Sequence, residues 1–193
     1  VPSDNQVPLI KPGKLSAAKL RRLLTGLRRE DPRVIIGPQV GEDASAIAFA
    51  DRCLVVTTDP VTFATDRIGW YTVHVNANDV AVMGATPRWL SVVLLLPEHD
   101  TTETLIDGIM RDVHDTAQSL GITVCGGHTE ITTGLDRPIV VGQMLGEVAR
   151  DRLVAKTGLE VGDQIILTQG VAIEGTALLA REKRDALRGQ VAD

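Results

Sequence analysis

Aromatic side chains and runs of basic residues are both scarce in this sequence. Phe, Trp and Tyr make up 3% of the 193 residues, and the formal net charge is −5. Proteins that bind single-stranded nucleic acid stack its bases on aromatic rings, and phosphate-rich polymers attract clusters of Lys and Arg. The composition therefore argues against nucleic acid and against an anionic membrane surface as main partners.

The sequence also has few cysteines and no long apolar run. The two cysteines, Cys53 and Cys125, are too few for a disulfide framework or a zinc cage. Each lies in an apolar run, so both are predicted to be reduced core thiols of a cytoplasmic protein. No apolar run reaches the roughly 18–20 residues of a membrane span, and no signal peptide is recognisable at the start. We therefore expect no membrane association.

Aliphatic side chains have to build the core. Hydrophobic residues make up 44% of the chain, so Val, Leu, Ile and Ala must supply what the aromatics do not. The length fits one domain, or one domain and part of another. Because the chain is acidic, a phosphate-rich ligand would need metal ions to bridge the two negative partners.

The N-terminal third predicts an arm, a helix, a loop and a hairpin. Residues 1–13 hold three prolines and no periodicity, which is typical of an extended arm. Leucines at helical spacing predict an amphipathic helix over 14–29. Pro and Gly punctuate residues 31–41, which indicates a loop. Two short β-rich runs predict a hairpin over 44–58.

The middle of the sequence predicts helices alternating with strands. One helix is expected over 67–84, and a second over 102–119 behind a capping box formed by Asp100 and Glu103. Gly84 and Gly121 follow the two helices as stops. The expected strands cover 88–97, 122–125 and 137–148, with a tight loop over 126–130.

The C-terminal part predicts a new structural unit. A turn over 157–163 precedes an expected strand at 164–170 and an expected helix at 174–187. One strand and one helix cannot bury a core alone, so residues from about 160 are interpreted as the start of a second domain. The expected organisation is an arm and helix over 1–34, a main domain over 35–150, and a linker with the start of the second domain over 151–193.

Three polar residues interrupt the expected helix over 67–84. Asn76 and Asp79 are three residues apart and therefore share one face, whereas Asn78 lies on roughly the opposite side. Polar groups within a Val- and Ala-rich helix are costly unless they are paired or coordinated. Asn76 and Asp79 are therefore candidates for a functional pair, whereas Asn78 is explained by a cap or by contact with a neighbour.

Other acidic and glycine residues stand at the ends of expected strands. Asp43 precedes a strand, Asp59 follows one, and Gly126 with Gly127 follows another. Taken singly, each is explained by a turn. Taken together, carboxylates suit Mg²⁺, which keeps substrate phosphates in its shell, and a glycine pair lets backbone N–H groups approach an anion. No P-loop or kinase glycine loop is present, which leaves an acidic, metal-bridged route for ATP.

Several segments together resemble the aminoimidazole ribonucleotide (AIR) synthase superfamily. This superfamily includes AIR synthase, thiamine-monophosphate kinase, selenophosphate synthetase and the E-type hydrogenase maturation protein. The similarity covers about residues 35–182. The segments that carry it are GEDASAI, VVTTD, VNANDVAVMGATPRWLSVVLLLP, GGHTE and IVVGQMLGEV, in that order.

The resemblance implies an α+β fold with a mixed or antiparallel sheet flanked by helices. It also implies a homodimer in which two sheets form a shared β-barrel, with ATP sites at the interface. Asp43, Asp59 and Asp79 match the positions that bind Mg²⁺ and ATP phosphate, and Asn76 matches the nucleotide-site asparagine. The residues that match the nucleotide-binding loop are Gly126, Gly127, His128, Thr129 and Glu130.

The resemblance leaves the acceptor substrate open. Members use ATP to phosphorylate an oxygen or selenium nucleophile, often an amide oxygen, and the hydrogenase-maturation type is the branch that the whole sequence resembles most. Alternatives are a phosphotransferase of the thiamine-monophosphate kinase or selenophosphate synthetase type, or a non-catalytic dimerisation module. His128 stands where thiamine-monophosphate kinases carry Asp, and residues 1–40 lack the cysteine of selenophosphate synthetases.

Overall fold

The computed structural model describes residues 9–27, 30–63 and 66–190 and has a mixed α+β architecture. Its centre is a six-stranded sheet in the order β1-β2-β3-β6-β4-β5. Neighbouring strands are antiparallel except for β4 and β5, which run parallel. The strands are β1 Val34–Ile36, β2 Ser45–Phe49, β3 Arg52–Val61, β4 Thr86–Pro97, β5 Thr123–Thr132 and β6 Ile139–Ala149.

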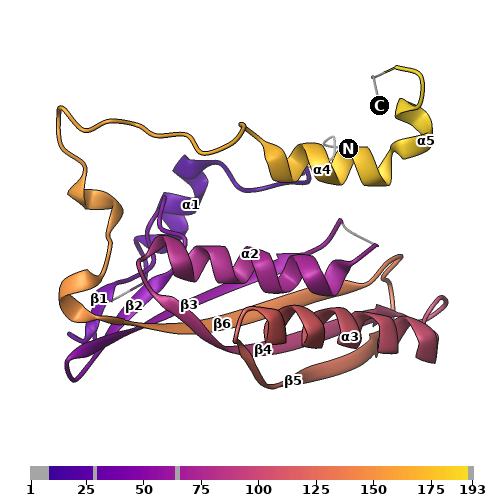
Figure 1. Cartoon of the computed structure of the whole chain (residues 1–193), viewed down its shortest axis with the longest axis horizontal. Helices are drawn as coiled ribbons and strands as arrows, with labels where there is room; N and C mark the ends of the chain where they lie inside the picture. Colours follow the sequence, from indigo (N-terminus) through magenta and orange to yellow (C-terminus); the bar gives the residue numbers. More distant parts are fainter. Residues whose placement is uncertain (1–8, 28–29, 64–65, 191–193) are drawn as a thin grey trace, which may run out of the picture.

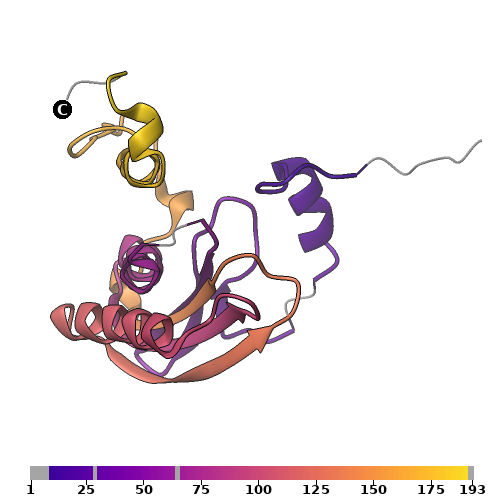
Figure 2. The same cartoon turned by 90° about the vertical axis from the view of Figure 1, so that its right-hand side faces the viewer.

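Two long helices cover one face of this sheet. Helix α2 (Ile68–Val82) and helix α3 (Glu103–Ser119) lie side by side on that face, whereas α1 (Ala17–Leu24) lies on the opposite side (Figures 1 and 2). The α3 helix is the crossover that parallel strands such as β4 and β5 require. The remaining elements are the 3₁₀ turns Arg150–Arg152 and Lys156–Gly158 and the helices α4 Ile173–Glu182 and α5 Arg184–Leu187.

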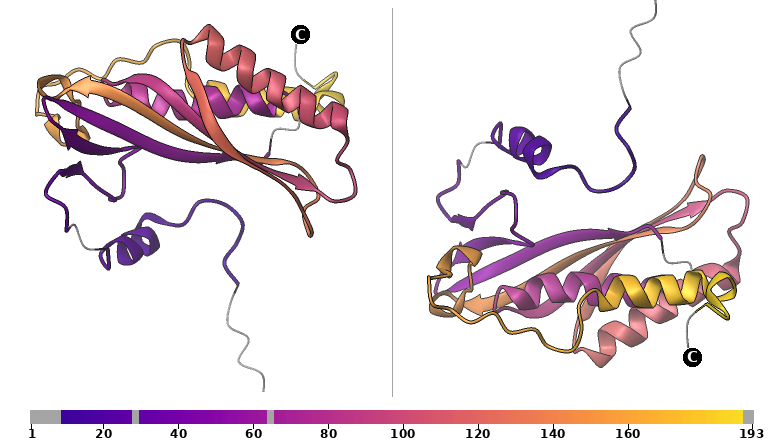
Figure 3. Two further views of the ribbon diagram at one scale, coloured as in Figure 1. Left: turned by 90° about the horizontal axis from the view of Figure 1, so that it is seen from below. Right: turned by 90° about the horizontal axis from the view of Figure 1, so that it is seen from above.

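Alternation along the strands separates a buried face from an open one. Along β3, Cys53, Val55 and Thr57 are buried beneath α2, whereas Leu54 and Val56 point to the other face and stay partly exposed. The same alternation continues along β4 and β6. In the left view of Figure 3 the sheet is seen nearly edge-on, with α2 and α3 on one side of it and α1 on the other. The core is aliphatic, as the composition predicts.

The expected hairpin, both long helices and the strands over 88–97, 122–125 and 137–148 are confirmed, and the structure extends several of them. The hairpin forms, although β3 continues to Val61, and both long helices begin and end within two residues of their expected ends. The residues expected to form a loop over 31–41 contain the short strand β1. Residues 28–29 of the expected helix over 14–29, and residues 1–8 of the arm, lie outside the described residues.

Four sequence-based expectations are wrong. The cap of α3 is Thr102, whose Oγ1 accepts a hydrogen bond from the N–H of Leu105 at 3.2 Å, so Asp100 and Glu103 form no capping box. Residues 126–130 continue β5 instead of forming a tight loop, because they pair in parallel with β4. Residues 164–170 form no strand. Cys125 is exposed, whereas Cys53 is buried as expected.

Among the described residues, no helix is both long enough and apolar enough to cross a bilayer.

Candidate functional site

Three aspartates from three elements meet at the part of β3 that extends beyond β2. Asp43 lies in the turn before β2, Asp59 lies on β3, and Asp79 lies on α2. Thr57 joins them: its Oγ1 is 3.0 Å from the main-chain oxygen of Asp43 and 3.1 Å from Oδ2 of Asp79. Strand pairing between β2 and β3 ends at Ser45 and Val56, which leaves this part of β3 open to the turn.

Of the three carboxylates in this cluster, only Asp43 has an ion-pair partner among the described residues. Burial, a side-chain hydrogen bond with Asp59 and the charges of Asp59 and Asp43 together raise the pKa of Asp79 to about 7, whereas the hydrogen bond with Thr57 opposes them. A carboxyl group that burial and neighbouring carboxylates together push toward its neutral form is a candidate for a place where a cation binds.

Asn76 is occupied by the backbone of the neighbouring strand. Its side chain is fully buried: Oδ1 accepts the N–H of Asp59 at 3.0 Å, and Nδ2 donates to the carbonyl oxygens of Asp59 at 3.2 Å and of Thr72 at 2.9 Å. Asn76 thus holds the main chain of Asp59 in place, and its own side chain does not face the cluster. Asn78, on the other side of α2, is exposed.

Glycines of β6 create the space that Asn76 occupies. Gly142 pairs with Asp59 in the sheet, and a Cβ atom at position 142 would lie 2.4 Å from Nδ2 of Asn76. A Cβ atom at Gly146 would lie 2.3 Å from Val80. Glycine inside a strand indicates that another segment approaches closely. Here that segment is α2, which is thereby held close enough to β3 for its polar side chains to reach the acidic cluster.

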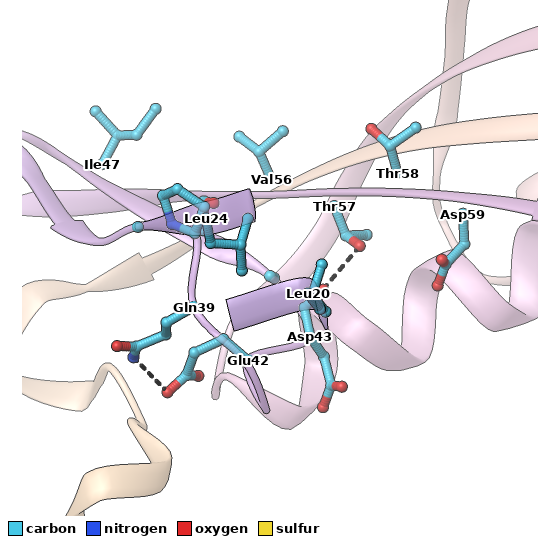
Figure 4. Close-up of a pocket in the computed structure, with 14 residues that line it drawn as sticks. Leu20, Leu24, Gln39, Glu42, Asp43, Ile47, Val56, Thr57, Thr58 and Asp59 are labelled. Carbon is cyan, nitrogen blue, oxygen red and sulfur yellow. Dashed lines mark hydrogen bonds between the residues drawn. The ribbon is translucent and has the colours of Figure 1, made fainter. Parts of the chain in front are cut away.

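A cavity of about 510 Å³ opens beside the aspartates. It lies between α1, the turn over 37–44 and strands β2 and β3, and Asp43, Thr57 and Asp59 are part of its wall. Figure 4 shows Thr57 and Asp59 on one side of β3 and Ile47, Val56 and Thr58 on the other. Glu42 also lines the cavity; Gln39 donates to its Oε1 at 3.0 Å, but its Oε2 is buried without a hydrogen-bond partner.

A second cavity, of about 500 Å³, adjoins the cluster on the opposite side of Asp59. Its wall is mainly apolar and includes Val61, Phe63, Tyr71 and Leu178. Asp59 lines both cavities.

The segment over Gly126–Glu130 lies elsewhere in the chain. Strands β6 and β4 separate β5 from β3, which amounts to three strand spacings of about 4.8 Å each. On the open face His128 lies 3.4 Å from Glu130, and the hydrogen bonds of Thr132 and then His128 lower the pKa of Glu130. Thr129 pairs with Leu94 and is also exposed. One chain alone does not bring this segment to the aspartates.

Gly127 also has a structural reason to be glycine. A Cβ atom there would lie 1.8 Å from the carbonyl oxygen of Val92 on β4, so any other residue would break the parallel pairing. No such contact occurs at Gly126, which is open to solvent. The pair expected to bind an anion therefore contains one residue that the sheet itself requires.

No ready-made metal cage is present in the described part of the chain. No three His, Cys, Asp or Glu side chains are arranged to hold an ion by themselves. This agrees with the coordination that Mg²⁺ prefers: it binds one or two carboxylates, and water and substrate phosphates complete its shell. Asp43, Asp59 and Asp79 suit that use, and the orphaned oxygen of Glu42 and the raised pKa of Asp79 show negative charge that a cation would relieve.

Sequence reasoning missed three residues of this site. Thr57 was passed over because a Thr within a strand has many explanations, and Gly142 because its partner Asn76 is distant in sequence. Lys156, whose Nζ lies 2.6 Å from Oδ2 of Asp43, carries no recognisable signal. For Gly142, a glycine within the β-rich run 139–149 is a sequence feature that indicates the close approach of another segment.

Comparison with known proteins adds family relationships to this geometry. Residues 41–148, more than half of the chain, match the family model described as AIR synthase related protein, N-terminal domain. A putative hydrogenase expression/formation protein of Methanocaldococcus jannaschii is 31% identical over 78% of this chain and 46% of its own length. A selenide, water dikinase of Dechloromonas aromatica is 27% identical over 92% and 51%.

A solved structure agrees with the fold. The crystal structure of HypE from Escherichia coli matches with a TM-score of 0.61 at 24% identity, over 87% of this chain and 53% of that one. At this identity the match supports the fold alone. The chain spans about half the length of the curated relatives it matches.

Proposed function

Because the chain belongs to the AIR synthase-related family, we propose that it is the ATP- and Mg²⁺-binding part of an ATP-dependent enzyme. The enzyme activates an amide or similar oxygen by phosphorylation, in the manner of hydrogenase maturation. The observation that carries this proposal is the meeting of Asp43, Asp59 and Asp79 beside a cavity, where Lys156 is the only ion-pair partner of the three among the described residues.

In this proposal the three aspartates hold Mg²⁺ together with ATP phosphates. The ion supplies neutralisation of the charge that builds up on the transferred phosphoryl group. The chain's own residues do the positioning: Asn76 fixes the main chain of Asp59, and Thr57 keeps Asp79 near Asp43. The cavity lined by Phe63 and Tyr71 lies across Asp59 from the nucleotide and takes the acceptor group.

The hydrogenase-maturation type is favoured by the M. jannaschii relative. A second candidate is a phosphotransferase of the thiamine-monophosphate kinase or selenophosphate synthetase type, which the dikinase relative supports. Incubation of the complete enzyme with ATP, Mg²⁺ and candidate acceptors separates them. Transfer of the γ-phosphate to thiamine monophosphate or selenide supports the second candidate, and ATP consumption that needs a carbamoylated peptide supports the first.

The nucleotide site is completed by a second copy of the chain. The open face of the sheet carries Trp89, which is 39% exposed, and Phe49, which is 66% exposed, along with partly exposed aliphatic side chains of β3, β4 and β6. An apolar face of this kind is typical of an interface. Pairing two such faces would bring the partner's Gly126–Glu130 segment, which one chain leaves apart, toward the aspartates.

The dimer is tested by mass in solution. We expect light scattering at micromolar concentration to give twice the 20.7 kDa mass of one chain. Val93 lies in the middle of the open face, so Val93→Glu buries a charge in the interface and should yield monomers. Gln118→Glu, on the exposed side of α3, is the matched control and should remain a dimer. A monomeric wild-type chain would contradict the shared site.

Binding of nucleotide by acidic-cluster variants tests the function itself. With a fluorescent ATP analogue, Asp43→Asn and Asp59→Asn should each lower the Mg²⁺-dependent affinity by about tenfold, since each removes one charged ligand. Asp115→Asn, on exposed α3 surface, is the control for the loss of one charge. If the chain is only a dimerisation module, all three variants will behave like the wild type.

A further inference from the structure

A short segment after β6 returns the chain to the acidic cluster. The N–H of Val154 donates to the carbonyl oxygen of Met83 at 3.0 Å, at the end of α2, and Leu153 and Ala155 pack against the core. Gly84 has φ +75°, and a Cβ atom there would lie 2.8 Å from the carbonyl oxygen of Arg152. The segment over 152–156 is therefore anchored at several points.

This anchoring delivers Lys156 to the turn before β2. Nζ of Lys156 lies 2.6 Å from Oδ2 of Asp43 and also donates to the carbonyl oxygen of Gly41. The ammonium group thus holds both a side chain and the main chain of the turn. No other ion pair to the three aspartates occurs within 9–27, 30–63 and 66–190.

Stability alone does not explain this ion pair. The side chains of Lys156 and Asp43 are 40% and 44% exposed, and ion pairs as exposed as this contribute only about 0–1 kcal/mol. The pair does place a positive charge on one of the carboxylates proposed to bind Mg²⁺. An ammonium group and a divalent cation that share one carboxylate repel each other, so the two compete for Asp43.

We propose that Lys156 is a built-in counter-ion of Asp43 that exchanges partners when nucleotide binds. Before binding, Lys156 neutralises Asp43 and holds the turn at the wall of the cavity. With nucleotide bound, the Asp43 carboxylate would hold Mg²⁺, and the released ammonium group of Lys156 would contact a phosphate oxygen of the nucleotide. The second half of this proposal rests on the proposed ATP-binding function, whereas the first half does not.

The geometry suits such an exchange. Lysine carries a compact charge on a flexible four-carbon stem, so its head can move several ångströms while the backbone stays anchored at Val154. Asp43 and Glu42 form part of the cavity wall, so an ammonium group that leaves Asp43 stays next to the space available for phosphate. Lys156 also begins the chain's path toward α4, which links the nucleotide site to that part of the protein.

Opposite effects on metal and nucleotide binding test the exchange. In the full chain at pH 7.5, we expect Lys156→Met to bind Mn²⁺ alone about three- to tenfold more tightly, because the competing cation is gone. The same variant should bind a fluorescent ATP analogue with Mg²⁺ about tenfold more weakly. Electron paramagnetic resonance of free Mn²⁺ measures the first quantity. Lys156→Arg, which keeps the charge, should lie nearer the wild type in both measurements.

Each outcome decides the matter. Lys183→Met, distant in the chain, controls for the loss of one positive charge, and circular dichroism checks that all variants fold. If Lys156→Met weakens the binding of Mn²⁺ and of nucleotide equally, Lys156 has only a structural role and the proposal is overturned. The proposal is also overturned if neither affinity changes, or if no variant binds Mn²⁺. If the wild type binds Mn²⁺ but no nucleotide, the proposed function fails, and the Mn²⁺ comparison still decides whether Lys156 is the counter-ion of Asp43.

Discussion

The substitution Asp79→Asn is expected to lower the affinity for ATP with Mg²⁺ by about 10- to 100-fold while making the ligand-free protein more stable at pH 8. The loss of affinity follows from the removal of one charged ligand from a cluster of three. The gain in stability follows from the raised pKa of Asp79, which shows that its ionised form is disfavoured in the folded state. A residue kept for stability would behave in the opposite way.

The sign of the pH dependence follows from the same pKa. Because the folded-state pKa of about 7 lies above the unfolded value of 3.8, Asp79 stabilises the fold fully below pH 3.8 and loses that contribution as pH rises through about 7. Asn at this position does not titrate. Since Asp79 is partly exposed, we expect the gain in the free energy of unfolding at pH 8 to be only about 1–2 kcal/mol.

Urea unfolding in the presence of a chelator measures this gain. The wild type and Asp79→Asn should differ little at pH 5 and diverge by pH 8, whereas Asp115→Asn should follow the wild type throughout. A variant that is less stable than the wild type at pH 8 would show that Asp79 supports the fold instead of straining it.

The second large effect concerns the contact between α2 and β6. We expect Asn76→Ala to lower the free energy of unfolding by about 2–4 kcal/mol, because the N–H and carbonyl groups of Asp59 lose a buried partner. Gly142→Ala should destabilise comparably, since its Cβ atom would lie 2.8 Å from Cγ of Asn76 and displace the amide. Both variants should also bind nucleotide less tightly, because Asp59 is no longer held.

A double-mutant cycle separates these two causes. In the variant with both Asn76→Ala and Gly142→Ala, the shortened side chain at position 76 leaves room for the new methyl group. The combined loss of stability should therefore be smaller than the sum of the single losses by at least about 1 kcal/mol. Additive losses would mean that Gly142 is not kept small for Asn76.

The long elements of this fold could be predicted from sequence because their patterns are local. Apolar periodicity and the stops at Gly84 and Gly121 locate α2 and α3, and alternation locates the β2–β3 hairpin. The prediction of a loop over 126–130 was wrong because glycines followed by polar residues usually indicate a turn. The pairing of these residues with β4 is a long-range contact that no local pattern records. The expected strand over 164–170 rested on apolar content alone, and within the described structure no neighbouring strand pairs with it.

The candidate site shows the same division. The spacing of Asn76 and Asp79 predicts that they share one face of α2, and both side chains do contact β3. Spacing could not show that the Asn76 amide would form its hydrogen bonds with the main chain of Asp59, because these bonds depend on how closely α2 approaches the sheet. Nor could it reveal Lys156, which reaches Asp43 from 113 positions away in sequence. The roles assigned to the Gly126–Glu130 segment remain predictions that depend on a second copy of the chain.

Calorimetric titration of the full chain with ATP, with and without Mg²⁺, tests the central claim most directly. We expect ATP binding that requires Mg²⁺ and that is weak, because the chain spans only about half the length of its relatives. Asp79→Asn should weaken this binding further. The absence of ATP binding under both conditions, or binding of equal strength with and without Mg²⁺, would contradict it.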